Sequence, residues 1–120
     1  MAYTPKDLLN QLLQTEGAMC AALVDYNSGM LLESVGSGVD LEMAAAGNTE
    51  VVRAKMKTMK SLGLSDSIED ILISLGKQYH IIRPVEKHDG LFIYYVLDRA
   101  RSNLAMARRK LLEAEAQTAI

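Results

Sequence analysis

Two histidines, His80 and His88, are the residues of this 120-residue chain whose types and spacing first suggest chemistry. If the segment between them folds as a hairpin, the two rings could lie near Glu86 or Asp89, and two imidazoles with a carboxylate can bind a transition metal. The spacing matches no established ligand motif, and one partly exposed strand histidine with one turn histidine is the commoner arrangement. We therefore expect no metal and no cofactor.

Serines and glycines give equally weak indications of catalysis. Ser28, Ser34 and Ser37 have no histidine close in sequence to act as a base, so a catalytic triad would have to be assembled in space. The Gly-Ser-Gly segment at 36–38 and the Gly-Lys pair at 76–77 both lack the rest of a phosphate-binding loop. We expect a non-enzyme. An esterase-like or metal-dependent enzyme is the remote alternative, and it would require a histidine within hydrogen-bonding reach of a serine or a carboxylate.

Composition and charge narrow the class of protein. A net charge of -2 gives no electrostatic basis for binding nucleic acid or an anionic membrane, and 49% apolar with 23% charged residues is typical of a soluble globular domain. No apolar run reaches the ~20 residues that span a bilayer, and the N-terminus has no basic region leading into an apolar one. The single cysteine, Cys20, excludes an intrachain disulfide. We expect one domain over residues 1–120, a cytoplasmic location, and proteins or small molecules as partners.

Five strands are predicted from apolar runs bounded by turn residues. The run 18–24 has no polar alternation, so both of its faces should be covered and the strand should be central in its sheet. A polar turn joins it to a second strand over 30–35. Three more strands, over 68–75, 79–85 and 91–97, are separated by short turns. Such short connections predict a mainly antiparallel sheet.

Three helices complete the predicted fold. Thr4 and Pro5 begin the first, which ends near Thr15, Asp40 caps a second over 41–62, and Asp98 caps a third over 99–116. The third has an apolar stripe at helical spacing, namely Ala100, Leu104, Ala107, Leu111 and Ala114. The order is helix, two strands, helix, three strands, helix. Helices on both faces are needed to cover the first strand, which makes a three-layer α/β/α arrangement of the α+β class.

The second helix has an apolar surface too wide for one sheet. One line of residues suits the core: Ala45, Val52, Met56 and Met59. A neighbouring line is formed by Ala44, Gly47, Val51 and Ala54. This second line either meets another subunit or lies under a loop that the sequence does not reveal.

At this point the chain resembles the roadblock (dynein light chain-type) family over nearly its whole length. The resemblance rests on Leu-Leu-Asn-Gln-Leu-Leu at 8–13, Gly-Ala at 17–18 leading into 21–25, the Gly29 turn into 30–34, the long Ala- and Met-rich helix, and the Asp-Arg junction at 98–99. It implies a profilin-like fold with a five-stranded antiparallel sheet in the order 2-1-5-4-3. It also implies helices one and three on one face and helix two on the other.

The resemblance further implies a homodimer and a partner. Helix two would meet its copy and the third strand would pair with its copy, through Ala44, Gly47, Val51, Ala54, Ile71, Ile73 and Leu75. Bacterial single-domain members often regulate or scaffold small Ras-like GTPases, and a motor or polarity complex is a related possibility. A small-molecule sensor of profilin-like fold is the alternative from another class, which an internal cavity with convergent polar groups would favour.

Five arginines are candidates for a role in GTP hydrolysis by a partner, because a GTPase activator can supply an arginine to the transition state of its GTPase. The candidates are Arg53, Arg99, Arg101, Arg108 and Arg109. An arginine on a rigid helix face is more often solvated or ion-paired. We therefore expect Glu50, Arg53 and Lys57 of helix two to contact a GTPase without performing chemistry.

Overall fold

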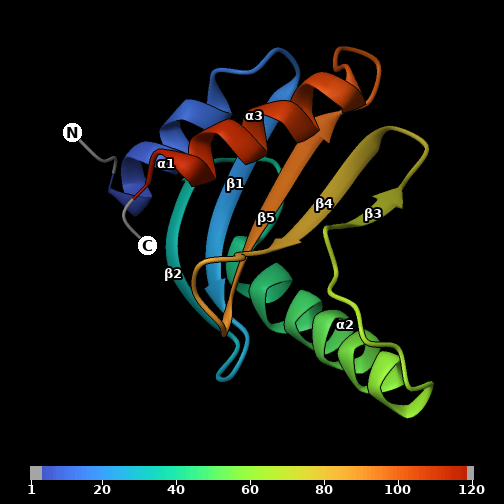
Figure 1. Ribbon diagram of the computed structural model, residues 1–120. Helices are drawn as coiled ribbons and strands as arrows, with labels where there is room; N and C mark the ends of the chain where they lie inside the picture. Colours follow the sequence, from blue (N-terminus) through green and yellow to red (C-terminus); the bar gives the residue numbers. More distant parts are fainter. Residues whose placement is uncertain (1–3, 119–120) are drawn as a thin grey trace.

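A five-stranded antiparallel sheet lies between helices on both faces in the structure of this chain, a computed structural model that describes residues 4–118 (Figure 1). The elements are α1 (Pro5–Leu13), β1 (Ala18–Asp25), β2 (Met30–Gly36), α2 (Leu41–Ser61), β3 (Ile71–Ser74), β4 (Gln78–Pro84), β5 (Leu91–Asp98) and α3 (Leu104–Ala116). The predicted element order is confirmed. Within residues 4–118, none of the helices has both the length and the apolar character needed to cross a membrane.

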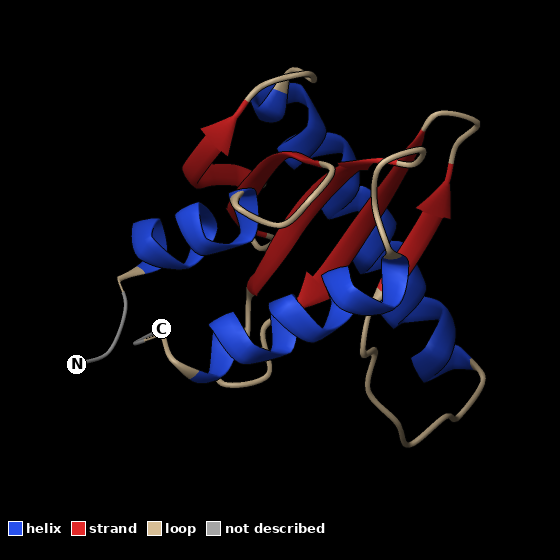
Figure 2. Cartoon of the chain, turned by 90° about the horizontal axis from the view of Figure 1, so that it is seen from above, coloured by secondary structure: helices blue, strands red, loops and turns tan. Residues whose placement is uncertain are grey.

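The sheet has the strand order β2-β1-β5-β4-β3, with every neighbouring pair antiparallel. β1 lies between β2 and β5, as its uniformly apolar sequence predicts. α1 and α3 cover one face and α2 the other, which Figures 1 and 2 show from two directions. The fold class and the strand order implied by the resemblance are therefore both confirmed.

Two apolar layers hold the sheet because successive β1 side chains point to opposite faces. Ala21 and Leu23 pack in the layer under α1 and α3, whereas Cys20, Ala22 and Val24 pack in the layer under α2. All five of these side chains are buried, with at most 4% of their surface exposed. The strand thus contributes to both cores, and none of these five side chains is available for chemistry.

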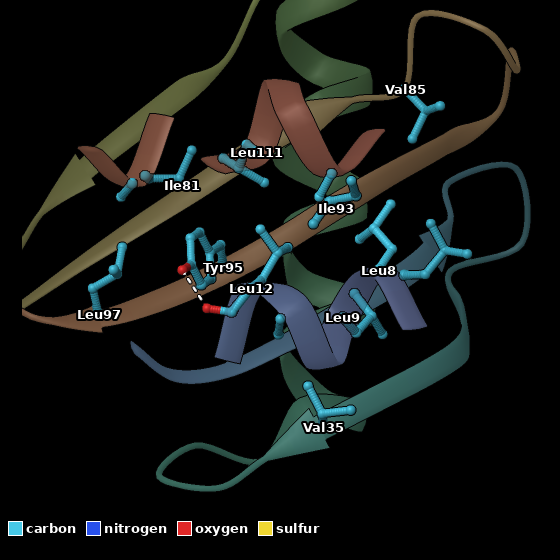
Figure 3. Close-up of a cluster of buried hydrophobic side chains, with 14 of the residues drawn as sticks. Leu8, Leu9, Leu12, Val35, Ile81, Val85, Ile93, Tyr95, Leu97 and Leu111 are labelled. Carbon is cyan, nitrogen blue, oxygen red and sulfur yellow. Dashed lines mark hydrogen bonds between the residues drawn. The ribbon is translucent and has the colours of Figure 1, made fainter. Parts of the chain in front are cut away.

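The layer under α1 and α3 is tied together by a buried tyrosine (Figure 3). Leu8, Leu9 and Leu12 of α1 are fully buried in it. The Tyr95 hydroxyl of β5 donates a 2.6 Å hydrogen bond to the carbonyl of Leu12, near the end of α1. Burial raises the pKa of the Tyr95 hydroxyl to about 12, so it stays protonated and keeps this donor.

The predicted start of α1 is confirmed. Thr4 accepts a 3.2 Å hydrogen bond from the Asp7 N–H, and the Asp7 carboxylate accepts one of 3.0 Å from the Thr4 N–H. Pro5 occupies the first turn, where its missing N–H has no helical partner to lose. Asp40 likewise caps α2 by accepting from the Met43 N–H at 3.1 Å.

The predicted start of the last helix is wrong. Asp98 does not cap a helix but ends β5, where its N–H donates to the Gly17 carbonyl at 2.7 Å. The next N–H, of Arg99, donates to the Lys77 carbonyl at 3.0 Å. Because the backbone is still held at the end of the sheet, it cannot turn into a helix here.

α3 begins five residues later, at Leu104. Asn103 is the cap, and its side chain accepts a 3.0 Å hydrogen bond from the Met106 N–H. Ala100, which helical spacing assigns to the core stripe, is consequently exposed. The rest of that stripe packs in the core as predicted: Leu104, Ala107, Leu111 and Ala114.

β3 is shorter than predicted, beginning at Ile71 opposite Ile82 of β4 instead of at residue 68. Beyond that pair the Glu69 carbonyl accepts a 3.1 Å hydrogen bond from the Arg83 guanidinium instead of one from a backbone N–H of β4. Pro84, the last residue of β4, has no N–H with which to continue the ladder. The segment before Ile71 therefore separates from β4 and forms a loop.

Candidate interaction surface

The outer side of α2 carries an exposed apolar stripe formed by Met43, Gly47, Val51 and Ala54, here the α2 stripe. Met43 is 73% exposed and Val51 39% exposed. A Cβ added to Gly47 would meet no other atom within 4 Å, so the surface is open at this point. Sequence reasoning identified three of these four residues and missed Met43, which the spacing i, i+4, i+8 would have added.

Ala44, the remaining predicted member of this line, lies half-buried against the α2-side core. The helix is fixed in this rotation by its buried side, where Ala45, Thr49 and Val52 face the sheet. Thr49 satisfies its hydroxyl by donating to the Ala45 carbonyl at 2.7 Å. The sheet side and the α2 stripe are thus separate apolar surfaces of one helix.

The C-terminal half of α2 is poorly covered by its own chain. The fully buried residues of the helix all lie at or before Val52. Met56 and Met59, predicted to face the core, are only half-buried. An amphipathic helix gains most of its stability from burying its apolar side, so this half of α2 offers surface to a further contact.

β3 forms the exposed edge of the sheet next to β4. Ile71 and Ile73 are half-buried in the layer under α2, and their strand has a partner on one side only among the described strands. Leu75 is 43% exposed and lies after the strand, in the turn where its N–H donates to the Gln78 carbonyl at 2.8 Å. The edge is therefore a short apolar strand followed by an exposed leucine.

Three charged residues predicted to contact a partner, Glu50, Arg53 and Lys57, are all exposed on α2. Their spacing of three and four residues places them along one side of the helix, next to the α2 stripe. None of the three forms an ion pair with another residue between 4 and 118. We call them the α2 charged ridge.

The two histidines have different surroundings. His80, on β4, is half-buried, and its Nδ1 and Nε2 lie 2.8 Å from the Tyr94 hydroxyl and the Gln78 Oε1. Burial lowers the pKa of His80 and raises that of Tyr94, although a hydrogen bond from Asn48 partly lowers the latter. His80 is thus held as a neutral ring in a structural network under α2.

His88 lies in the exposed β4–β5 loop, where its Nδ1 is 2.9 Å from the Asp89 carbonyl oxygen. Neither histidine is hydrogen-bonded to a serine or a carboxylate among the described residues. In the same part of the chain, no group of three histidine, cysteine, aspartate or glutamate residues has an arrangement that could hold a metal.

The predicted arginines fall into different roles. Arg108 on α3 binds Asp70 through two hydrogen bonds of 2.9 and 3.0 Å, and these raise the pKa of its guanidinium. Arg99 lies over the Tyr79 ring at 5.1 Å and donates to the Leu75 carbonyl. Of the candidates, Arg53 belongs to the α2 charged ridge. Arg101 and Arg109 are exposed elsewhere.

A surface cleft of about 750 Å³ was not predicted. It lies between the C-terminal part of α2, the loop 62–70, the end of β4 with the β4–β5 loop, and α3. Figure 1 shows the loop as the yellow-green segment that returns from the far end of α2 to β3. The signal in the sequence was Pro84, which pairs with Phe92 of β5 but has no N–H to continue the ladder toward β3, so the loop separates from β4.

Solved structures support the class of fold. The chain superposes on a Roadblock/LC7 domain from Streptomyces avermitilis with a TM-score of 0.81 and 13% identity, over 95% of this chain and 93% of the other. It superposes on MglB of Myxococcus xanthus with a TM-score of 0.81 and 19% identity, over 93% and 89%. For the gliding protein MglB of Thermus thermophilus the TM-score is 0.70 at 16% identity, over 92% and 87%.

This chain therefore has the roadblock fold, as its resemblance in sequence implies. Among folds of this class it is similar to the MglB structures along most of its length. No protein-family model matches the sequence, and no curated protein matches it significantly. At these identities the likeness shows the fold alone.

Proposed function

We propose that this protein is a non-catalytic homodimer that regulates or scaffolds a small Ras-like GTPase. The observation that carries the proposal is the α2 stripe, an apolar surface on the side of α2 away from its own sheet, bordered by the α2 charged ridge. Ile71 and Ile73 of the β3 edge lie in the layer on the α2 side of the sheet, so an apolar helix surface and a strand edge are both available for association.

In the proposed dimer, α2 meets its copy through Ala44, Gly47, Val51 and Ala54, and β3 pairs with its copy around Ile71, Ile73 and Leu75. Small residues allow two helices to approach closely, and the missing Cβ at Gly47 leaves room for a partner side chain. A similar solved structure is described as MglB with a tetrameric arrangement, with a TM-score of 0.77 at 17% identity over 90% of this chain and 79% of the other. Assembly through this fold is thus compatible with its known relatives.

The dimer is tested by placing a charge in the proposed contact. Val51→Glu should yield monomers in size-exclusion chromatography with light scattering, because an unpaired carboxylate would be buried between the helices. Arg109→Glu, on the exposed part of α3, is the matched control and should leave the dimer intact. An unchanged dimer for Val51→Glu would place the contact elsewhere.

The GTPase role is tested with GTPases encoded beside this protein. The expected result is co-purification that is weakened by the double change Arg53→Glu and Lys57→Glu, without loss of the dimer. Hydrolysis rates with and without the protein then separate regulation from tethering. No binding to any neighbouring GTPase and no effect on hydrolysis would refute the proposal.

A small-molecule sensor is the second candidate, and the cleft of about 750 Å³ is the observation in its favour. Two polar groups that line the cleft, Asp70 and Arg108, are already bound to each other. Thermal unfolding with a library of small acids, amines and nucleotides would test this role. A concentration-dependent rise in melting temperature would support a sensor.

A further inference from the structure

We propose that the cleft beside the loop 62–70, here the acidic cleft, is a docking site for a cationic, partly apolar segment of a partner protein. The acidic cleft shares no residue with the α2 stripe or the α2 charged ridge. A segment bound here would therefore use none of the residues of those two surfaces. The inference does not depend on the proposed function.

The cleft exists because β3 does not continue its pairing with β4 as far as the end of β4. The Val85 N–H donates to the Leu91 carbonyl of β5 at 2.9 Å. Because the backbone N–H groups of successive strand residues point to opposite sides, the backbone nitrogen of Pro84 faces the β3 side. Pro84 has no N–H to offer there. The chain on that side is held instead by the Arg83 side chain, which reaches the Glu69 carbonyl across the gap.

The apolar part of the cleft is unusually exposed for large side chains. Leu64 on the loop and Leu112 on α3 are 53% and 54% exposed. Met56 and Met59 of α2 line the cleft and are half-buried. Burial of apolar surface drives association, and methionine side chains adapt to the shape of an apolar ligand. The occupant should therefore contribute at least one large apolar side chain.

The charges of the cleft favour a cationic occupant. Five carboxylates line it, from Asp66, Glu69, Asp70, Glu86 and Asp89, against three cations, from Lys60, Arg83 and Arg108. Two of the cations are already neutralised, since Arg108 is paired with Asp70 and Arg83 with Glu115. The other four carboxylates make no ion pair with any residue from 4 to 118, and all four residues are exposed.

Charge and apolar surface together indicate a segment of protein. Four exposed, unpaired carboxylates require an occupant with positive charges, and Leu64 and Leu112 require one with apolar side chains. A free metal ion or polyamine satisfies the carboxylates but leaves these leucines exposed. The acidic rim and the exposed leucines therefore fit a basic, partly apolar segment of protein.

The test uses a fluorescein-labelled synthetic peptide of repeating Lys-Leu-Leu-Lys units, with a Glu-Leu-Leu-Glu peptide as its charge-reversed control. Fluorescence anisotropy should show binding of the basic peptide only, weakening as salt rises. In amide NMR spectra of the whole protein, the shifted resonances should cluster at 62–70 and 85–90. The double variant Asp66→Lys with Glu86→Lys should bind at least about tenfold more weakly, because charge reversal in the rim repels the lysines.

Matched variants separate the cleft from the net charge of the molecule. Glu16→Lys with Glu42→Lys changes the charge equally at exposed sites outside the cleft and should bind normally. Leu112→Ser should weaken binding, whereas Met106→Ser, at an exposed α3 position outside the cleft, should not. If the double lysine variant fails to fold by circular dichroism, Asp66→Asn with Glu86→Gln tests the same point.

Four outcomes of the binding experiments would overturn the proposal, and a fifth outcome without peptide would do so as well. The four are no binding, equal binding of the acidic peptide, equal weakening by the Glu16 and Glu42 changes, and NMR shifts confined to the α2 stripe. Shifts at the cleft that follow protein concentration without peptide would mean that a second copy of the chain occupies it, which also contradicts a foreign partner.

Discussion

Arg83 and Glu115 form a buried ion pair between β4 and α3. Their charged atoms lie 3.0 Å apart, with side chains only 10% and 6% exposed. The pair also leaves the Arg83 Nε and the Glu115 Oε1 without partners among residues 4–118. Such a pair is costly to desolvate, so it is more sensitive to the loss of one partner than to the loss of both.

We expect Arg83→Met to lower the free energy of unfolding by about 3–5 kcal/mol, because Glu115 would be left buried and unpaired. The double variant Arg83→Met with Glu115→Leu should recover most of that loss. Urea unfolding followed by circular dichroism measures both. Lys110→Ala breaks an exposed pair with Glu113 and is expected to change stability by less than about 1 kcal/mol. Equal losses for the single and double variants would contradict this account.

His80 should make stability depend on pH. Burial lowers its pKa in the folded state below the ordinary value of 6.5, so below pH 6.5 the unfolded chain binds a proton that the folded chain resists. Stability should therefore fall as pH drops below 6.5, by about 1.4 kcal/mol for each unit between the two pKa values. His80→Gln should flatten this dependence in urea unfolding between about pH 7.5 and about pH 5.5, a range that brackets the ordinary histidine pKa. His88→Gln is the control and should retain it.

At the scale of elements, two residues near the start of α3 are able to cap a helix, Asp98 and Asn103, and only Asn103 does so. The Asn103 side chain satisfies the Met106 N–H. Asn103→Ala should therefore lower the free energy of unfolding by about 1 kcal/mol, the usual contribution of an N-cap. Asn10→Ala, on the exposed side of α1, should have a smaller effect in the same urea titration. No change for Asn103→Ala would show that the cap is dispensable.

Most of the elements were predictable because their information is local. The uniformly apolar run at β1, the capping box of Thr4 and Asp7 and the periodicity of α2 all act within a few residues. The two boundary errors arose from distant contacts. Gly17 and Lys77 hold the end of β5 and delay α3, and Arg83 with Pro84 ends the pairing of β3. Neither contact can be read from the segment that it limits.

The candidate surface was predictable only in part for the same reason. Gly47, Val51 and Ala54 stood out because a helix on one sheet does not need two apolar lines. Ala44 could not be distinguished from them, since its half-buried position depends on how the helix is rotated against the sheet. The acidic cleft joins four separate segments, which sequence spacing does not bring together.

For the molecule as a whole, the proposed dimer predicts that thermal stability depends on protein concentration. A protein that unfolds to separate chains has a melting temperature that rises with concentration by mass action. Calorimetry over a hundredfold concentration range should show this rise for the native sequence. Mass action over that range changes the apparent free energy of unfolding of the dimer by ~2.7 kcal/mol. Val51→Glu should abolish it, and Arg109→Glu should not. A melting temperature independent of concentration would argue for a folded monomer.

The two edges of the sheet are unequal, and this limits how large an assembly can grow. The pairing of β2 with β1 is irregular opposite Leu23 and Val24 of β1, and the Ser34 carbonyl of β2 accepts a 3.0 Å hydrogen bond from Lys6 of α1. β3 has no such obstruction among the contacts described for it. In the language of polymer chemistry, a chain with one reactive end is a terminator, because joining consumes the end and leaves none to propagate. Pairing through β3 should therefore stop at two chains instead of continuing into a fibre.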